Sequence, residues 1–203
     1  MFSVKSTILS TVTALAMISG SAMAADWTLD PTHSSISFGI DHLVISEVDG
    51  SFNNFSGTVT NFDGKKVKDT VVSVTINVES IDTNEADRDK HLRGADFFDV
   101  EKYPTATFTS TKIKKTGDNT YDMTGDFTLH GVTNEITIPM TLKGTVNDPW
   151  GNTRAGFTGA VSLDRTQWGL TFGKTLETGQ LVVGNEARLE INAELVQVKE
   201  EKK

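Results

Sequence analysis

Apolar and polar residues alternate with a period of two along most of the chain from Asp26 onward. Such alternation is typical of β-strands that have one face against a core and the other in solvent. The clearest run spans residues 72–79, where Val72, Val74, Ile76 and Val78 alternate with Ser73, Thr75, Asn77 and Glu79. Clusters of Gly, Asn and Asp separate the runs and favour turns. The pattern predicts about eight strands.

Eight antiparallel strands suit either a β-sandwich or a closed up-and-down barrel, whose interior is filled or holds one small ligand. The same period also fits an outer-membrane barrel, in which the apolar side chains face lipid. An aromatic content of 8% and a polar segment at 197–203 argue against that third architecture. We therefore expect an all-β fold whose apolar faces point toward a core or a cavity.

One polar segment interrupts the alternation. Residues 84–93 are predicted to form a short helix in a connection between strands, with Asp82 as N-cap, Glu85 three residues later and Gly94 as terminator. The alternative is a long connection without a helix.

The first residues have the features of a secretory signal peptide. Lys5 precedes an uncharged apolar run, and Ala22-Met23-Ala24 forms a small-x-small cleavage site. The apolar run is shorter than the roughly 20 residues that a membrane-spanning helix needs. We expect a signal peptide at 1–24, a single domain at 25–203 and a periplasmic protein that does not span the membrane.

Charge and composition exclude several classes of function. The formal charge is −8 without a Lys/Arg cluster, so a nucleic-acid partner is not expected. The absence of cysteine excludes disulfides, thiolate metal sites and cysteine nucleophiles. The four histidines form no HxH or HExxH pattern, and the chain has no Gly-x-Ser-x-Gly or Gly-rich phosphate motif. The sequence therefore predicts no metal site, no catalytic residue and no cofactor, although a catalytic carboxylate pair assembled from different strands would leave no motif.

The remaining candidate for function is the apolar face itself. The inward Val, Ile and Phe side chains either fill the core or line a hollow. Each buried methylene of an aliphatic ligand contributes about 0.8 kcal/mol, so a long hydrocarbon can bind without any polar motif.

Several segments resemble one family, the YceI-like periplasmic proteins with a lipocalin-like barrel that binds polyisoprenoid lipids. The most specific is His91-Leu92-x-x-x-Asp96-Phe97-Phe98-Asp99-Val100-x-x-Tyr103-Pro104-x-Ala106-x-Phe108. Similar segments are Trp27-x-Leu-Asp30-x-x-His33-Ser34-x-Ile36-x-Phe38, Thr128-Leu129-His130-Gly131-Val132-Thr133, Leu163-Asp164-Arg165 and Trp168-Gly169.

The resemblance implies an eight-stranded barrel that carries or stores an isoprenoid chain, with an isoprenoid quinone or a polyprenyl lipid as candidate ligand, and no catalysis. Contact with a membrane or a membrane protein would transfer the ligand. We expect the tail to lie along Ile36, Phe38, Val72, Val74, Ile76, Val78, Phe108, Phe127, Ile138 and Phe157. The polar head group is expected near His33, His42, Arg154 or Arg165 at the barrel mouth, unless these residues only tie strand ends together. An enzyme acting on a lipid in the same cavity, and a structural or adhesive sandwich, are the alternatives.

Overall fold

The computed structural model describes residues 26–67 and 69–199, so the predicted signal peptide at 1–24 lies outside the described residues. In this part of the chain the strands are β1 (Trp27–Leu29), β2 (Ser35–His42), β3 (Ser46–Phe52), β4 (Phe55–Thr60), β5 (Val71–Asn77), β6 (Ile81–Asp82), β7 (Thr105–Lys115), β8 (Thr120–Leu129), β9 (Val132–Asn147), β10 (Thr153–Asp164) and β11 (Val183–Gln197). The helical segments described are α1 (Ala86–Arg93) and the 3-10 turns η1 (Val78–Ser80) and η2 (Arg165–Trp168).

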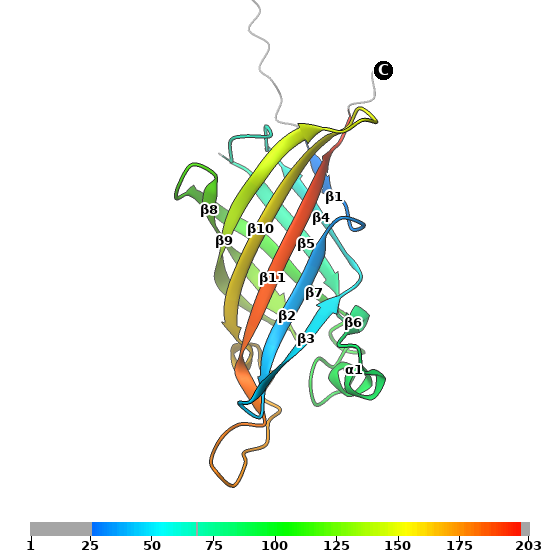
Figure 1. The fold of residues 1–203 in the computed structure, drawn as a ribbon, viewed down its shortest axis with the longest axis vertical. Coiled ribbons are helices and arrows are strands. Elements are labelled where there is room, and N and C mark those ends of the chain that lie inside the picture. The colour runs from blue at the N-terminus through cyan, green and yellow to red at the C-terminus, as the bar shows by residue number, and fades with distance from the viewer. Residues whose placement is uncertain (1–25, 68, 200–203) are drawn as a thin grey trace, which may run out of the picture.

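The strands form one closed antiparallel barrel (Figure 1). The eleven strands occupy eight positions around the barrel. Three of these positions are each formed by two consecutive strands with a short break between them, namely β1 and β2, β3 and β4, and β5 and β6. Strand β11 pairs with β2 along most of its length and with β1 at its end, where Trp27 lies opposite Gln197. Pairing of β1 with β4, and of β3 with β6, completes the ring. The predicted eight-stranded up-and-down barrel is confirmed, and the sandwich is excluded.

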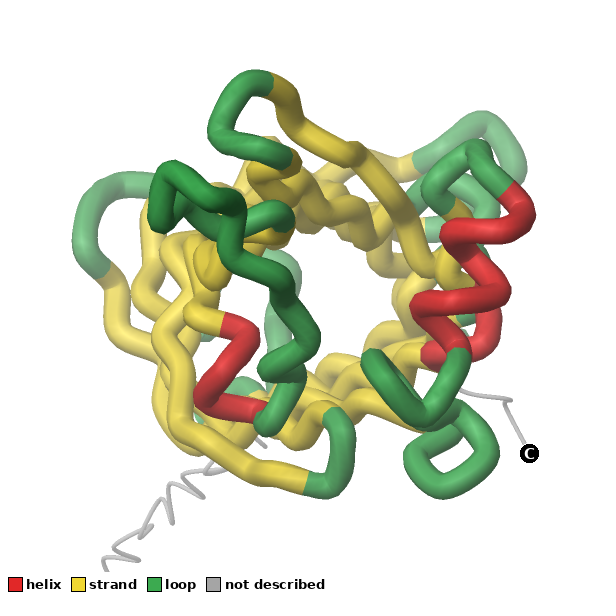
Figure 2. The backbone as a smooth tube through the Cα atoms, turned by 90° about the horizontal axis from the view of Figure 1, so that it is seen from below, coloured by secondary structure: helices red, strands yellow, loops and turns green. Residues whose placement is uncertain are grey.

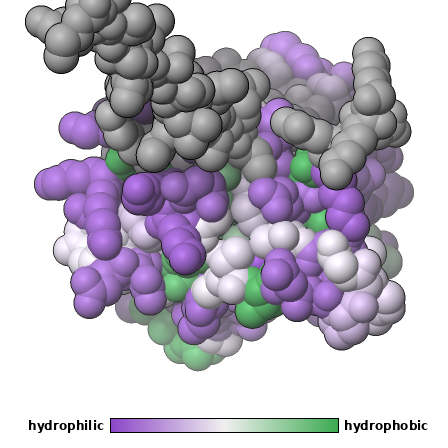
Figure 3. Space-filling model, turned by 90° about the horizontal axis from the view of Figure 1, so that it is seen from above, coloured by the Kyte–Doolittle hydropathy of each residue, from purple (hydrophilic) through white to green (hydrophobic). Residues whose placement is uncertain are grey.

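The two ends of the barrel differ. At the end drawn uppermost in Figure 1, Trp27 and Phe62 are each only 1% exposed, and their rings lie 5.3 Å apart. The indole Nε1 of Trp27 donates a hydrogen bond to the carbonyl of Phe62 at 2.8 Å. A packed apolar cluster around these two rings therefore lies at the upper end. Where described residues are visible from above, they are mainly hydrophilic (Figure 3).

The lower end is framed by irregular segments rather than by a packed plug. Helix α1, the turn between β2 and β3, and the connection from η2 to β11 surround it (Figure 2). The main-chain N–H of Leu43 in that turn donates to the carbonyl of Val182 in the connection, at 2.9 Å. These two segments are thus held side by side at the rim.

Helix α1 is confirmed, but it begins later than the sequence indicated. Its N-cap is Glu85, whose carboxylate accepts hydrogen bonds from the main-chain N–H groups of Asp87 and Arg88. The predicted cap, Asp82, instead accepts from the N–H of Asn84. Asn84 has a φ of 59°, a left-handed conformation that cannot continue into a right-handed helix, so the helix starts after it. Gly94 ends the helix as expected.

Candidate ligand-binding cavity

The inward faces of the strands enclose an upper cavity of about 130 Å³. Its wall is mainly aliphatic and aromatic, because alternate residues of each strand point inward. Eight of the ten predicted tail residues line it: Ile36, Val72, Val74, Ile76, Phe108, Phe127, Ile138 and Phe157.

A second cavity of about 290 Å³ lies toward the lower end. Ile76, Phe127 and Leu189 line both cavities, so the two adjoin and together follow the barrel interior. The predicted residue Phe38 lies here rather than in the upper cavity, and its ring packs 5.6 Å from that of Phe52. At the rim, the side chain of His91 is 49% exposed. The lower cavity therefore reaches the surface, and the upper cavity extends as far as Phe62, Val59 and Leu195 of the cluster around Trp27.

Val78 was wrongly assigned to the lining. It is fully buried but contributes to neither cavity wall. Strand β5 ends at Asn77, and Val78 begins the 3-10 turn η1, where it packs in the same core cluster as Ile76 without bordering either cavity.

The four polar residues expected at one mouth are separated by the structure. His42 and Arg165 line the lower cavity, but His33 and Arg154 line neither. His33 precedes β2 and His42 ends it, and an eight-residue strand extends about 26 Å. His42 and Arg165 therefore lie in the half of the barrel that holds the lower cavity, and the placement of His33 and Arg154 at the same mouth is wrong, because these two residues lie in the opposite half.

Arg154 forms an ion-pair cluster in the upper half. Its guanidinium donates to Asp30 at 2.8 Å, Asp148 at 2.8 Å and Glu194 at 2.6 Å. The hydroxyl of Thr32 and the Arg154 guanidinium hold the pKa of Asp30 well below its usual range. Arg154 is also the main cause of the lowered pKa of Asp148, and these carboxylates raise the pKa of Arg154. The cluster joins three separate segments of the chain.

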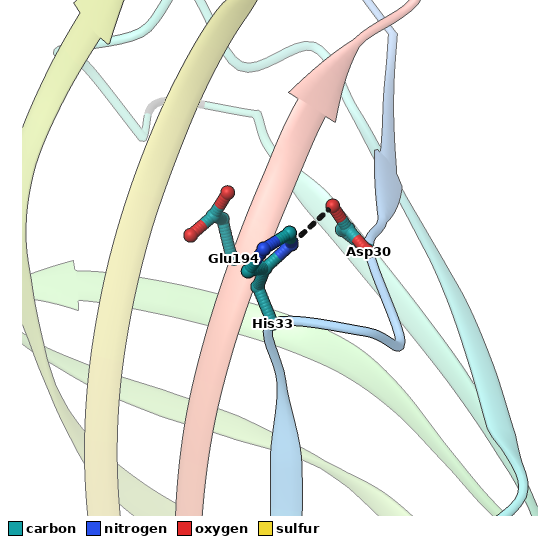
Figure 4. Close-up of side chains that lie close together, drawn as sticks. All are labelled: Asp30, His33 and Glu194. Carbon is teal, nitrogen blue, oxygen red and sulfur yellow. Dashed lines mark hydrogen bonds and ion pairs between the residues drawn. The ribbon is translucent and has the colours of Figure 1, made fainter. Parts of the chain in front are cut away.

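His33 extends this cluster, with its Nδ1 2.9 Å from a carboxylate oxygen of Asp30 (Figure 4). Asp30, His33 and Glu194 present ligand atoms close enough together to hold a metal ion. Both carboxylates already accept hydrogen bonds from the Arg154 guanidinium, however, and Asp30 also contacts His33, so the oxygen atoms that a metal ion would need are engaged within the cluster. We interpret these residues as a structural cluster that holds strand ends together by hydrogen bonds and ion pairs, which is the alternative to head-group binding that the sequence left open.

Arg165 has a different environment, in the wall of the lower cavity. It is only 7% exposed, and its guanidinium donates to the carbonyls of Gly184, Leu170 and Val183. Removal from water lowers the pKa of Arg165. These bonds fix the connection between η2 and β11 at the rim.

Two further features of the lower cavity were not among the predicted site residues. Arg88 of α1 lines it, held by hydrogen bonds to the hydroxyl and carbonyl of Thr83, and nothing in the sequence distinguished Arg88 from a solvated helix residue. Phe97 and Phe172 also line it, with ring centroids 4.5 Å apart and His91 stacked edge-on against both. Phe97 belongs to the most specific segment of the family resemblance, which carried the signal for this aromatic cluster.

Comparison with known proteins decides the family. A family model described as the YceI-like domain matches residues 27–195. The chain belongs to the YceI-like family. Protein YceI of Escherichia coli O17:K52:H18 is 51% identical over 149 residues, which span 72% of this chain and 77% of that protein. The resemblance seen in the sequence is thus confirmed.

Two solved structures share the barrel fold. BcnA of Burkholderia cenocepacia aligns with a TM-score of 0.72 and 26% identity, covering 82% of this chain and 98% of that chain. A polyisoprenoid binding domain from Saccharophagus degradans, implicated in plant cell wall breakdown, aligns with a TM-score of 0.64 over 87% of this chain and 99% of that chain. Its identity is 16%, so the second likeness concerns the fold alone.

Proposed function

We propose that this YceI-like protein binds a long-chain polyisoprenoid lipid inside its barrel, with an isoprenoid quinone among the candidate ligands. The observation that carries this proposal is the pair of adjoining cavities with predominantly apolar walls, which together follow the barrel interior. An elongated apolar chain with one polar end matches such a space. The polyisoprenoid binding activity named for the Saccharophagus degradans domain supports the same ligand class.

Chain length should govern affinity if this proposal is correct. At about 0.8 kcal/mol for each buried carbon, each added five-carbon unit contributes about 4 kcal/mol to the binding free energy before the entropy cost of ordering the flexible tail is subtracted. Affinity should therefore rise with each unit until the upper cavity is full.

We infer a binding protein rather than an enzyme. The upper cavity contributes Ser34, Thr58, Thr70 and Tyr121 as hydroxyl groups, with no histidine or carboxylate lining it among the described residues to activate them. A lipid recovered chemically unchanged after incubation would support binding, and its conversion would support the enzyme.

The proposal includes a periplasmic location, after removal of the predicted signal peptide, and ligand transfer at the lower end. None of the helices that the structure describes has the length and apolar character to traverse a bilayer. The turn between β2 and β3 exposes Val44 by 57% and Ile45 by 83%, beside the rim of the lower cavity. Such a small apolar tip suits transient contact with a membrane or a membrane protein.

Native mass spectrometry of the protein purified from its host, followed by organic extraction, tests the proposal. We expect a bound lipid whose mass contains five-carbon repeats. Val74→Trp fills the upper cavity and should exclude that lipid or favour a shorter one, whereas Thr75→Trp, on the exposed face of the same strand, should retain it. An empty wild-type protein that also fails to bind added isoprenoid alcohols would contradict the proposal.

A further inference from the structure

The turn between β2 and β3 has a backbone conformation that its residues do not favour. Leu43 and Val44, its two central residues, are left-handed, with φ values of 53° and 62°. The N–H of Ile45 donates to the carbonyl of His42 at 3.2 Å and closes the turn. Turns with two left-handed residues prefer Asn-Gly, and a β-branched residue with positive φ is strained. The chain therefore keeps apolar residues in a turn whose backbone they destabilise.

The same residues form an apolar tip, Leu43 to Ile45, that is largely in water. Val44 is 57% exposed, and Ile45, at 83%, is the most exposed large apolar residue in the described part of the chain. Residues 42–46 include no carboxylate, lysine or arginine. A turn that served only to reverse the chain would be more stable with polar side chains or glycine. Strain and apolar exposure together indicate that something outside the chain covers the tip.

The apolar tip is fixed beside the mouth of the lower cavity. The N–H of Leu43 donates to the carbonyl of Val182 at 2.9 Å, and the hydroxyl of Ser46 donates to the carbonyl of His42 at 3.3 Å. His42 lines the lower cavity. The turn lies at the lower end of β2 and β3 (Figure 1) and forms part of the rim seen from below (Figure 2). The tip and the mouth therefore meet the same surroundings.

The charges near the apolar tip decide which surface can cover it. Asp41 is exposed and forms no ion pair with a described residue, whereas Glu47 is paired with Arg188 at 2.7 Å. The chain as a whole has a formal charge of −8. A strongly anionic surface would repel this end of the barrel, but a surface without net charge accepts exposed aliphatic side chains.

We propose that the apolar tip inserts Val44 and Ile45 into a zwitterionic phospholipid bilayer and thereby places the mouth of the lower cavity on the membrane surface. This inference rests on the proposed lipid-binding function and adds the surface from which the lipid is taken. With the mouth at the bilayer, an apolar chain passes from the acyl chains into the cavity without exposure to water. Only two side chains insert, so the contact is weak and reversible.

Flotation of the exported protein with phosphatidylcholine vesicles tests the docking. We expect binding that weakens when phosphatidylglycerol is mixed into the vesicles, and added salt should reduce this weakening. Ile45→Ser should lower the partition coefficient about tenfold, because it removes the most exposed apolar side chain of the tip.

Val146→Ser is the matched control, since Val146 is an aliphatic residue of β9 that is 62% exposed at the opposite end of the barrel. It should bind vesicles as the wild type does. Equal losses in Ile45→Ser and Val146→Ser would overturn the proposal. Wild-type protein that binds none of these vesicles would also overturn it and leave a protein partner as the occupant of the tip.

The strained backbone gives a second readout. Glycine adopts a positive φ without strain, so Val44→Gly should leave the Tm unchanged or raise it, while the loss of one inserted side chain lowers vesicle binding. Weaker binding in a variant that is no less stable cannot be due to unfolding. Val44→Gly that binds vesicles as tightly as the wild type would refute the insertion of Val44.

Transfer of geranylgeraniol separates this inference from the proposed function. In Ile45→Ser the equilibrium affinity for geranylgeraniol should stay unchanged, because Ile45 lines neither cavity, but transfer from loaded protein to phosphatidylcholine vesicles should slow. Wild-type protein that binds geranylgeraniol but no vesicles would overturn the docking and leave the proposed function intact. Protein that binds vesicles but no isoprenoid alcohol would instead contradict the proposed function.

Discussion

Replacing Val74 by aspartate tests which face of β5 lines the cavity. Val74 is partly buried, lines the upper cavity and lies opposite Phe108 of β7 and Gly57 of β4. Thr75, the next residue, is exposed on the outer face. Val74→Asp and Thr75→Asp thus introduce the same carboxylate on the two sides of one strand.

The expected cost of Val74→Asp has two parts. Losing a partly buried valine removes about 1 kcal/mol of the 1.5–3 kcal/mol that full burial contributes. Holding the new carboxyl neutral at pH 7, against an unfolded pKa near 3.9, costs at most about 4 kcal/mol, at 1.36 kcal/mol per pH unit. We therefore expect Val74→Asp to lower the free energy of unfolding by about 3–5 kcal/mol at neutral pH, and Thr75→Asp to change it by less than about 0.5 kcal/mol.

The pH dependence has a definite sign. The apolar wall raises the pKa of the new carboxyl in the folded state, so above the unfolded pKa the unfolded chain binds fewer protons. The loss of stability in Val74→Asp therefore grows as pH rises from about 4 and levels off above the raised folded pKa. Val74→Asn, which is polar but does not titrate, should show a loss that does not vary with pH.

Urea unfolding followed by tryptophan fluorescence at about pH 4 and pH 7 measures both effects. Each variant is compared with the wild type at the same pH, which cancels changes due to the native carboxylates. Equal losses in Val74→Asp and Thr75→Asp, or a loss in Val74→Asp that does not vary with pH, would refute the assignment of an apolar interior to this face.

Arg154→Met should reduce the loss of stability at acid pH, because the lowered pKa values of Asp30 and Asp148 contribute stability that is present above about pH 4 and lost as the pH falls. Urea unfolding of this variant and of the wild type at several pH values measures the effect. An unchanged pH dependence would show that the ion pairs contribute nothing. Phe127→Trp should narrow the passage between the cavities, so that geranylgeraniol loses more affinity than the shorter farnesol; equal losses would place the tail elsewhere. The mature protein should begin at Ala25 and fractionate with the periplasm, as N-terminal sequencing and cell fractionation would show, and a retained Met1 would contradict this expectation.

Much of the fold could be predicted from local pattern. Period-two alternation depends only on the backbone geometry of a strand. It therefore showed which residues share the inward face of β5 and that the barrel has eight strand positions. The alternation could not show that β5 ends at Asn77, because Val78 continues the apolar pattern while its backbone turns. The first residue of α1 could not be predicted either, because the left-handed φ of Asn84 does not follow from its residue type.

The polar part of the site depended on tertiary structure. His33 and His42 share one short stretch of sequence, yet the extended length of β2 separates them, and Arg154 meets Asp30 only because β1, β10 and β11 are neighbours in the closed ring. Arg88 reaches the lower cavity because α1 packs at the rim. Side-chain periodicity is a property of neighbouring residues and can be predicted from sequence, whereas the pairing or isolation of a charge depends on which distant segments barrel closure brings within a few ångströms of it.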